Sequence, residues 1–214
     1  MHHLKIKALL GVLDAGEVDY EMDFRLELSR NLLDDKAKDL IKEVYDDFGG
    51  KGAPVYLDRL KFDFKINRFL FLYDGAHHFN RYRLTSLKSS IYEEFTFNWL
   101  DSYKRLCRTY EKDCLKGGIQ ERVWSGPPLA SRCFGDAEEP GDLSGNGSPG
   151  WKLNAYNDMQ YDLISRLSGY KIIRLPMYEN IMMSGSLKRL DQLLLTQPEE
   201  IHKSMVNWLK RKMV

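Results

Sequence analysis

The segment from Leu57 to Phe79, LDRLKFDFKINRFLFLYDGAHHF, constrains the fold more than any other part of this chain. Apolar and charged residues alternate from Leu60 to Ile66, which is the two-residue period of a strand buried on one face. Asn67-Arg68 then predicts a tight turn, and the continuously apolar run Phe69 to Tyr73 predicts a strand covered on both faces. We therefore expect a β-hairpin here.

Ionisable side chains stand where the two strands of this hairpin end. Asp63 lies in the first strand, Asp74 follows the second, and His77 and His78 come next. Antiparallel pairing would bring the two aspartates to the same end, where they repel one another unless a cation lies between them. Carboxylate oxygens suit Mg²⁺, and a nearby histidine can transfer protons. The alternative is an ordinary Asp74-Gly75 turn, an exposed Asp63 and two solvated histidines.

The same string resembles the PD-(D/E)XK nuclease superfamily, and within it the Vsr endonucleases and their DUF559-type relatives. Those proteins carry an aspartate in an apolar strand, a short turn, an apolar strand that ends in a small motif with glycine, and a histidine soon after. The matching residues are Asp63, the run Phe69 to Tyr73, and Asp74-Gly75-Ala76-His77-His78. A second match, Asn157 to Leu175, is similar to the family's charged helix, glycine turn and final hydrophobic strand.

This resemblance implies a restriction-endonuclease-like fold, α/β or α+β, with a central mixed sheet flanked by helices, and a DNA endonuclease that depends on Mg²⁺ or Mn²⁺. By resemblance, Asp63 is the principal metal ligand and Asp74 a second ligand or a group that positions water. His78 is the acid–base residue, with His77 as the alternative. Asp158, on the charged helix, is the expected partner that orients the His78 imidazole.

The chain departs from the superfamily at the acid-any-lysine triplet of the second strand. Leu72 stands where DUF559-type chains have an acid, and no lysine follows Asp74. Vsr-like enzymes also lack the triplet, so the Vsr-like variant fits better. The missing triplet supports a second hypothesis, a nucleic-acid-binding or assembly module without catalysis. A third hypothesis takes His77, His78 and the cysteines as the site of a zinc hydrolase.

Length and composition set the remaining limits. With 214 residues and 43% hydrophobic content, the chain has enough apolar material for one core. The net charge of +1 gives no general signal for nucleic acid, so DNA binding requires local groups of basic residues. No apolar run approaches the roughly 20 residues of a membrane span, and we expect a cytoplasmic protein.

Besides DNA, we expect a second copy of the chain or a larger partner that supplies specificity. The expected DNA contacts are Arg81, Arg83, Lys88 and Lys152.

Three cysteines, Cys107, Cys114 and Cys133, are an odd number, which argues against a disulfide framework. Zinc would need a fourth ligand and usually a tighter first pair of cysteines. The spacing therefore favours buried, reduced thiols over a zinc site.

We expect a single domain over 1–214. Glycine, proline and acidic residues predict a long irregular region from Gly117 to Gly150, and Trp151 to Leu167 predicts a helix that carries Asp158 and Asp162 on one face. Tyr170 to Leu175 predicts a strand. Phe24 to Phe48 predicts helix, broken near Asn31, with Asp34 or Asp35 as a cap. The expected parts are N-terminal helices in 1–50, the site hairpin in 55–80, a helical and irregular insertion in 81–150, a helix and strand in 151–180, and a C-terminal helical hairpin in 185–214 that is split at Thr196-Gln197-Pro198.

Overall fold

The computed structural model describes residues 2–29, 32–119, 121–183, 185–196 and 202–213, which form a mixed α/β protein. The chain divides into two compact units. The predicted helix break at Asn31 and the predicted split at Gln197-Pro198 lie outside the described residues, and the single-domain organisation stays a prediction. Unit 1 consists of Met1–Leu26, Lys61–Gly75 and Gly169–Val214, and unit 2 consists of Glu27–Leu60 and Ala76–Ser168.

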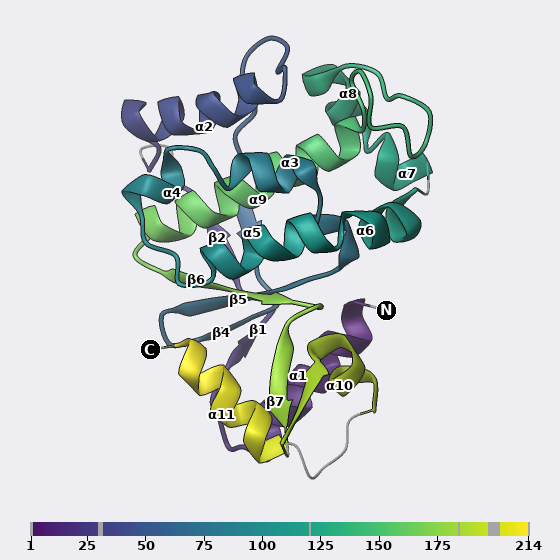
Figure 1. The fold of residues 1–214 in the computed structure, drawn as a ribbon. Coiled ribbons are helices and arrows are strands. Elements are labelled where there is room, and N and C mark those ends of the chain that lie inside the picture. Colours follow the sequence, from purple (N-terminus) through teal and green to yellow (C-terminus); the bar gives the residue numbers. More distant parts are fainter. Residues whose placement is uncertain (1, 30–31, 120, 184, 197–201, 214) are drawn as a thin grey trace. The chain divides into compact units, whose positions relative to one another are not determined.

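Unit 1 contains a four-stranded mixed sheet (Figure 1). The first two neighbouring pairs of strands are antiparallel and the last pair is parallel. A mixed sheet, which the sequence predicted, is therefore present. In the order of the sheet, the strands are β1 (Glu21–Met22), β4 (Phe64–Ile66), β5 (Phe69–Asp74) and β6 (Lys171–Pro176).

The predicted hairpin is formed by β4 and β5. Its turn contains Asn67 at a φ of 51°, a left-handed conformation that asparagine tolerates well. Phe64 stands opposite Phe71, and their rings stack with centroids 4.5 Å apart. The strand predicted before the turn is interrupted at Asp63, because this side chain accepts a hydrogen bond from the Tyr73 backbone at 2.7 Å. The residues before the interruption form the separate strand β3 (Arg59–Lys61).

Three helices share the hydrophobic core of unit 1 with the sheet (Figure 1). Leu9 and Leu13 of the first helix are buried in one cluster with Phe71 and Leu175 of the sheet. The second helix contributes Leu193 to the same cluster. The helices are α1 (His2–Ala15), α10 (Leu190–Thr196) and α11 (His202–Lys212).

The sequence reasoning missed a hairpin just before α10. It consists of β7 (Asn180–Met183) and β8 (Ser186–Arg189), so the C-terminal region is not a purely helical hairpin. Ile181 and Met183 are buried while Met182 is exposed, which is the period of a strand. Because Leu187 belongs to β8, the helix expected in this region begins only at Leu190.

Unit 2 is organised around the long helix α9 (Pro149–Leu167), which was expected from the sequence. Ser148 caps its start by accepting the Trp151 backbone N–H at 3.1 Å, and Pro149 occupies its first turn. Tyr156 and Leu163 are fully buried, as befits a helix covered on several sides (Figure 1). The helices in contact with α9 are α2 (Asp35–Asp47), α3 (Arg81–Ser86), α7 (Glu121–Trp124) and α8 (Pro128–Phe134).

Two predictions about the flanking regions need correction. The residues Arg25–Glu27, predicted as helix, form strand β2, which pairs with β3, and only α2 matches the helix expected before Gly49. Asp34 caps α2 by accepting the Ala37 N–H at 2.8 Å, as predicted.

The region Gly117–Gly150 is not simply irregular, because α7 and α8 lie in it and Trp124 is fully buried. The residues before it form α3, α4 (Ile91–Glu94), α5 (Leu100–Thr109) and α6 (Glu111–Gly118).

Candidate functional site

The five predicted site residues are divided between the two units. Asp63 and Asp74 belong to unit 1, whereas His77, His78 and Asp158 belong to unit 2. The chain passes from one group to the other at Gly75, between β5 and the 3-10 helix η1 (Ala76–His78).

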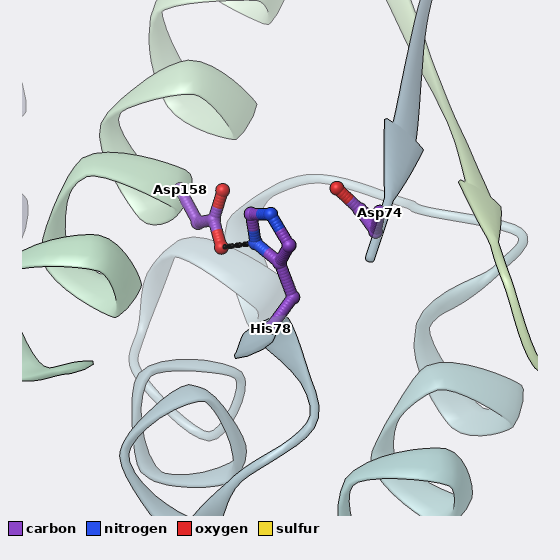
Figure 2. A group of neighbouring side chains, drawn as sticks. All are labelled: Asp74, His78 and Asp158. Atoms are coloured by element: carbon purple, nitrogen blue, oxygen red, sulfur yellow. Dashed lines mark hydrogen bonds and ion pairs between the residues drawn. The ribbon is translucent and has the colours of Figure 1, made fainter. Parts of the chain in front are cut away.

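The centre of the unit 2 group is a contact between an imidazole and a carboxylate. Nδ1 of His78 lies 2.7 Å from Oδ2 of Asp158 (Figure 2). This is the pairing that the sequence predicted, and it joins residues that are 80 positions apart. The His78 side chain is 17% exposed and that of Asp158 10%, so the pair is largely shielded from water without being sealed off. The contact fixes the orientation of the imidazole ring.

Asn80 holds the two histidines in place. Its side-chain oxygen caps α3 by accepting the N–H groups of Tyr82 and Arg83, at 3.0 and 3.1 Å. Its side-chain nitrogen donates to the carbonyl of His77 at 2.8 Å. The end of η1 is thereby tied to the start of α3. The rings of His77 and His78 lie side by side, with centroids 4.1 Å apart.

A fully buried ion pair supports the same face of α9. Nη2 of Arg83 lies 2.6 Å from Oδ2 of Asp162, and both side chains have 0% exposure. The Tyr92 hydroxyl donates to the same carboxylate oxygen at 2.6 Å. Nε of Arg83 also lies 3.9 Å from Asp158 Oδ2, so one guanidinium faces both aspartates of the helix. The four-residue spacing of Asp158 and Asp162 placed them on one face in the sequence, but it gave no sign that Arg83 is their partner.

This burial corrects the prediction that Arg83 contacts DNA, because its guanidinium is enclosed among protein groups. Lys152 is also buried, with 8% exposure, and its Nζ donates to Asn146 Oδ1 at 2.7 Å. The prediction that Lys152 contacts a DNA phosphate at the surface is therefore corrected as well. Arg81 is half exposed and forms two hydrogen bonds with the Glu111 carboxylate, at 2.9 and 3.1 Å. Lys88 is exposed, and its role in binding DNA stays a prediction.

In unit 1, Asp74 has a cationic partner of its own. Nη1 of Arg174 lies 3.0 Å from Oδ1 and 3.2 Å from Oδ2 of Asp74. Their side-chain exposures are 0% and 2%, so the guanidinium neutralises the carboxylate inside the fold. The sequence called for a metal ion beside Asp74 because its negative charge needs a positive partner. Arg174 supplies that positive charge. A magnesium ion at Asp74 would have to share the carboxylate with this guanidinium.

Asp63 is the more accessible of the two predicted ligands, with a side chain that is 15% exposed. Its Oδ2 accepts the Tyr73 backbone N–H, and its Oδ1 lies 2.8 Å from Nε2 of His2. The His2 side chain is 55% exposed, so water reaches this contact. Of the two aspartates, Asp63 fits the donor chemistry of a hard divalent cation better.

The state of the cysteines bears on the zinc hypothesis, which stays a prediction. All three are free and buried, as the sequence predicted. Burial raises the pKa of the Cys114 thiol to about 12, and Asn80 Nδ2 lies 3.9 Å from its sulfur. Zinc binds the thiolate, and this site favours the neutral thiol.

Unit 1 also carries a basic groove. A hollow of about 500 Å³ is lined by Lys210 and Arg211 of α11, together with Ser204, Asn207 and Met182. Two cations beside hydroxyl and amide groups are the side chains that most often contact phosphate.

Within the ranges that the structure describes, no helix combines the length and apolar character needed to cross a membrane.

The fold and the paired side chains thus define a mixed α/β protein with a histidine–aspartate pair in its helical unit. The chain belongs to a family of unknown function, DUF7255, whose model matches residues 43–196. His78, Asp158 and both buried ion pairs lie within the matched residues, whereas His2 lies outside them. Comparison with curated proteins and with solved structures finds no significant match.

Proposed function

We propose that this chain is a metal-dependent endonuclease that hydrolyses phosphodiester bonds in DNA, with His78 as its acid–base residue and Asp158 as the group that orients it. The observation that carries the proposal is the 2.7 Å contact between His78 Nδ1 and Asp158 Oδ2. When the Nδ1–H group donates a hydrogen bond to the carboxylate, Nε2 is the nitrogen that exchanges a proton with the reacting groups. Such proton transfer contributes about 10²–10⁴ to the rate of hydrolytic enzymes.

The cation belongs to the proposal because of the resemblance to Vsr-type nucleases, and Asp63 is the residue that would hold it. Mg²⁺ or Mn²⁺ supplies screening of the negative charge on a phosphate. Asp74 contributes to the proposal through the fold, since its buried pair with Arg174 fixes the end of β5 against β6. A restriction-endonuclease-like fold and a cytoplasmic location are parts of the same proposal.

DNA binding is assigned to exposed cations and not to the buried ones. The groove at Lys210 and Arg211 supports this part of the proposal, because both cations lie at the surface, where a backbone phosphate can reach them. Lys88 is a second exposed cation, in unit 2. A homodimer or a larger partner would supply the sequence specificity that this small set of contacts does not.

The test is incubation of supercoiled plasmid with the purified chain and Mg²⁺ or Mn²⁺. Metal-dependent nicking by the wild type, lost in Asp63→Ala and in the presence of a chelator, supports the proposal. Asp19→Ala, which removes an exposed carboxylate of the same unit, serves as the matched control and is expected to keep the activity.

The second candidate is a nucleic-acid-binding or assembly module without catalysis. The ion pair of Asp74 and Arg174 favours it, because it commits one predicted ligand to the fold. Binding of labelled duplex DNA without any nicking under either metal ion would select this alternative.

A further inference from the structure

A cavity of about 250 Å³ lies within unit 2, apart from the histidine–aspartate pair. Residues at the end of α2, in α3, in the loop before α9 and at the start of α9 line it. Its volume is below the range of about 300–1,000 Å³ that holds drug-sized ligands. The cavity therefore suits a small molecule.

The notable group in its wall is the ammonium of Lys152. This side chain is 8% exposed, and its Nζ donates one hydrogen bond to Asn146 Oδ1 and lies 5.7 Å from the centroid of the Tyr82 ring. An ammonium has three N–H donors. Among the side chains that the structure describes, no carboxylate lies within ion-pair distance of it.

A buried ammonium without a counter-ion is unfavourable. Burial, and then the charge of Lys51, lower the pKa of Lys152. The protein nevertheless holds the group firmly, because Asn146 is itself fixed at both ends. Its backbone N–H donates to Glu138 Oε1 at 2.9 Å, and its side-chain nitrogen donates to the Phe134 carbonyl at 2.9 Å. The amide oxygen is thus directed at Lys152 by the fold.

The rest of the wall defines the kind of molecule that fits. Phe48 and Tyr82 present rings whose centroids are 6.0 Å apart at an angle of 80°, which gives an apolar surface. Asp47 on the same wall opposes anions of high charge, and Arg81, which also lines the cavity, is already paired with Glu111. A single negative group attached to an apolar body satisfies both parts of the wall.

We propose that this cavity binds a small organic anion, a carboxylate or a phosphate ester, whose charged group meets Lys152 and whose apolar part packs against Phe48 and Tyr82. The site goes beyond the proposed nuclease, since it uses neither His78 nor a metal ion. It is a ligand site in the helical unit.

The experiment measures the melting temperature of the full chain, without metal, in benzoate, phenyl phosphate or inorganic phosphate. We expect benzoate, phenyl phosphate or both to raise Tm, with a Kd on the order of 1 mM, and inorganic phosphate to act more weakly. The comparison of benzoate with phenyl phosphate tells a carboxylate site from a phosphate-ester site. Lys152→Met, which keeps the length and removes the charge, should lose at least about tenfold in affinity.

Three variants keep this result separate from other effects. Lys112→Gln removes an exposed lysine of the same unit and should respond like the wild type. His78→Gln should also respond like the wild type, so failure of the nuclease proposal leaves this one intact. Thr85→Trp fills the cavity from its exposed wall and should abolish the response, and it decides the matter if Lys152→Met does not fold.

Without any ligand, Lys152→Met should melt at or above the wild-type temperature, because an unpaired buried charge is removed. A purely structural role of Lys152 predicts the reverse. The proposal is overturned if no organic anion raises Tm, or if Lys152→Met and Thr85→Trp respond to the anions as the wild type does.

Discussion

Arg174 on β6 holds both carboxylate oxygens of Asp74 on β5 with one nitrogen, at 3.0 and 3.2 Å, and both side chains are buried. In the parallel register Asp74 stands beside Pro176, so Arg174 reaches it from two residues earlier on the neighbouring strand. The pair accounts for an acid at the end of an apolar strand without any bound cation. The pair therefore stabilises the contact between β5 and β6.

Removing the arginine of this pair should destabilise the protein strongly. In Arg174→Met the buried Asp74 carboxylate loses the guanidinium that neutralises it, which costs about 3–5 kcal/mol in the free energy of unfolding. Chemical denaturation monitored by circular dichroism measures this loss. Arg68→Met, at an exposed arginine of the neighbouring turn, should change the stability by no more than about 0.5 kcal/mol. Equal, small effects of both variants would contradict the role given to Arg174.

The double variant Asp74→Leu with Arg174→Met provides a sharper test of the same pair. Replacing both charges by apolar groups should recover much of the stability that the single variant loses, because no unpaired charge remains. If the double variant is as unstable as the sum of the two single variants, the residues do not act as a pair.

The Arg83 network in unit 2 should behave in the same way. Asp162→Asn leaves the buried Arg83 guanidinium without its nearest carboxylate and should cost about 3–5 kcal/mol. Tyr92→Phe removes a hydroxyl that donates to that carboxylate and accepts from Arg83 Nη1 at 3.0 Å, but it keeps the ion pair and should cost about 1–2 kcal/mol. Urea unfolding of both variants gives the comparison, and a Tyr92→Phe loss as large as that of Asp162→Asn would show that the ion pair is not the main contribution.

The buried cysteines should be protected from alkylation in the native protein. Burial raises the pKa of the Cys114 thiol to about 12, so iodoacetamide at pH 8 should leave Cys114 unmodified in the native protein and modify it after unfolding in guanidinium. Mass spectrometry of the peptides reports both states. Rapid native modification of Cys114 would disagree with its burial.

The same pKa shift has a consequence for stability. A thiol whose folded pKa is raised favours the folded state below the unfolded pKa, and that contribution is lost as pH rises towards the folded value. The contribution of Cys114 to stability should therefore decline between about pH 9 and pH 12, and a Cys114→Ala variant should show a shallower decline there.

The sequence predicted best where the chain is locally consistent. Helix α9, strand β6 and the β4–β5 hairpin follow the local hydrophobic pattern, and Asn67 lies in the predicted turn. The contact of His78 with Asp158 was expected from the resemblance and is present. These features need only local patterns or one known pairing of motifs.

The rest depended on contacts between distant residues that no pattern marks. Arg174 and Arg83 looked like a strand cation and a surface cation, because nothing in the sequence tells a paired arginine from a solvated one. Strand β2 was taken for helix since its three residues are too few to show a period. The short helices α7 and α8 were hidden by glycine and proline, which serve there as caps and turns.

The most direct measurement of the central claim is metal-dependent nicking of supercoiled plasmid by the wild type, His78→Gln and Asp158→Asn, compared at equal fractions folded. The account predicts that His78→Gln loses about 10²–10⁴ in rate and that Asp158→Asn loses about 10–100-fold, while Asp101→Asn, at an exposed acid of unit 2, keeps its activity. No nicking by the wild type with either metal ion, or full activity in His78→Gln, would contradict it.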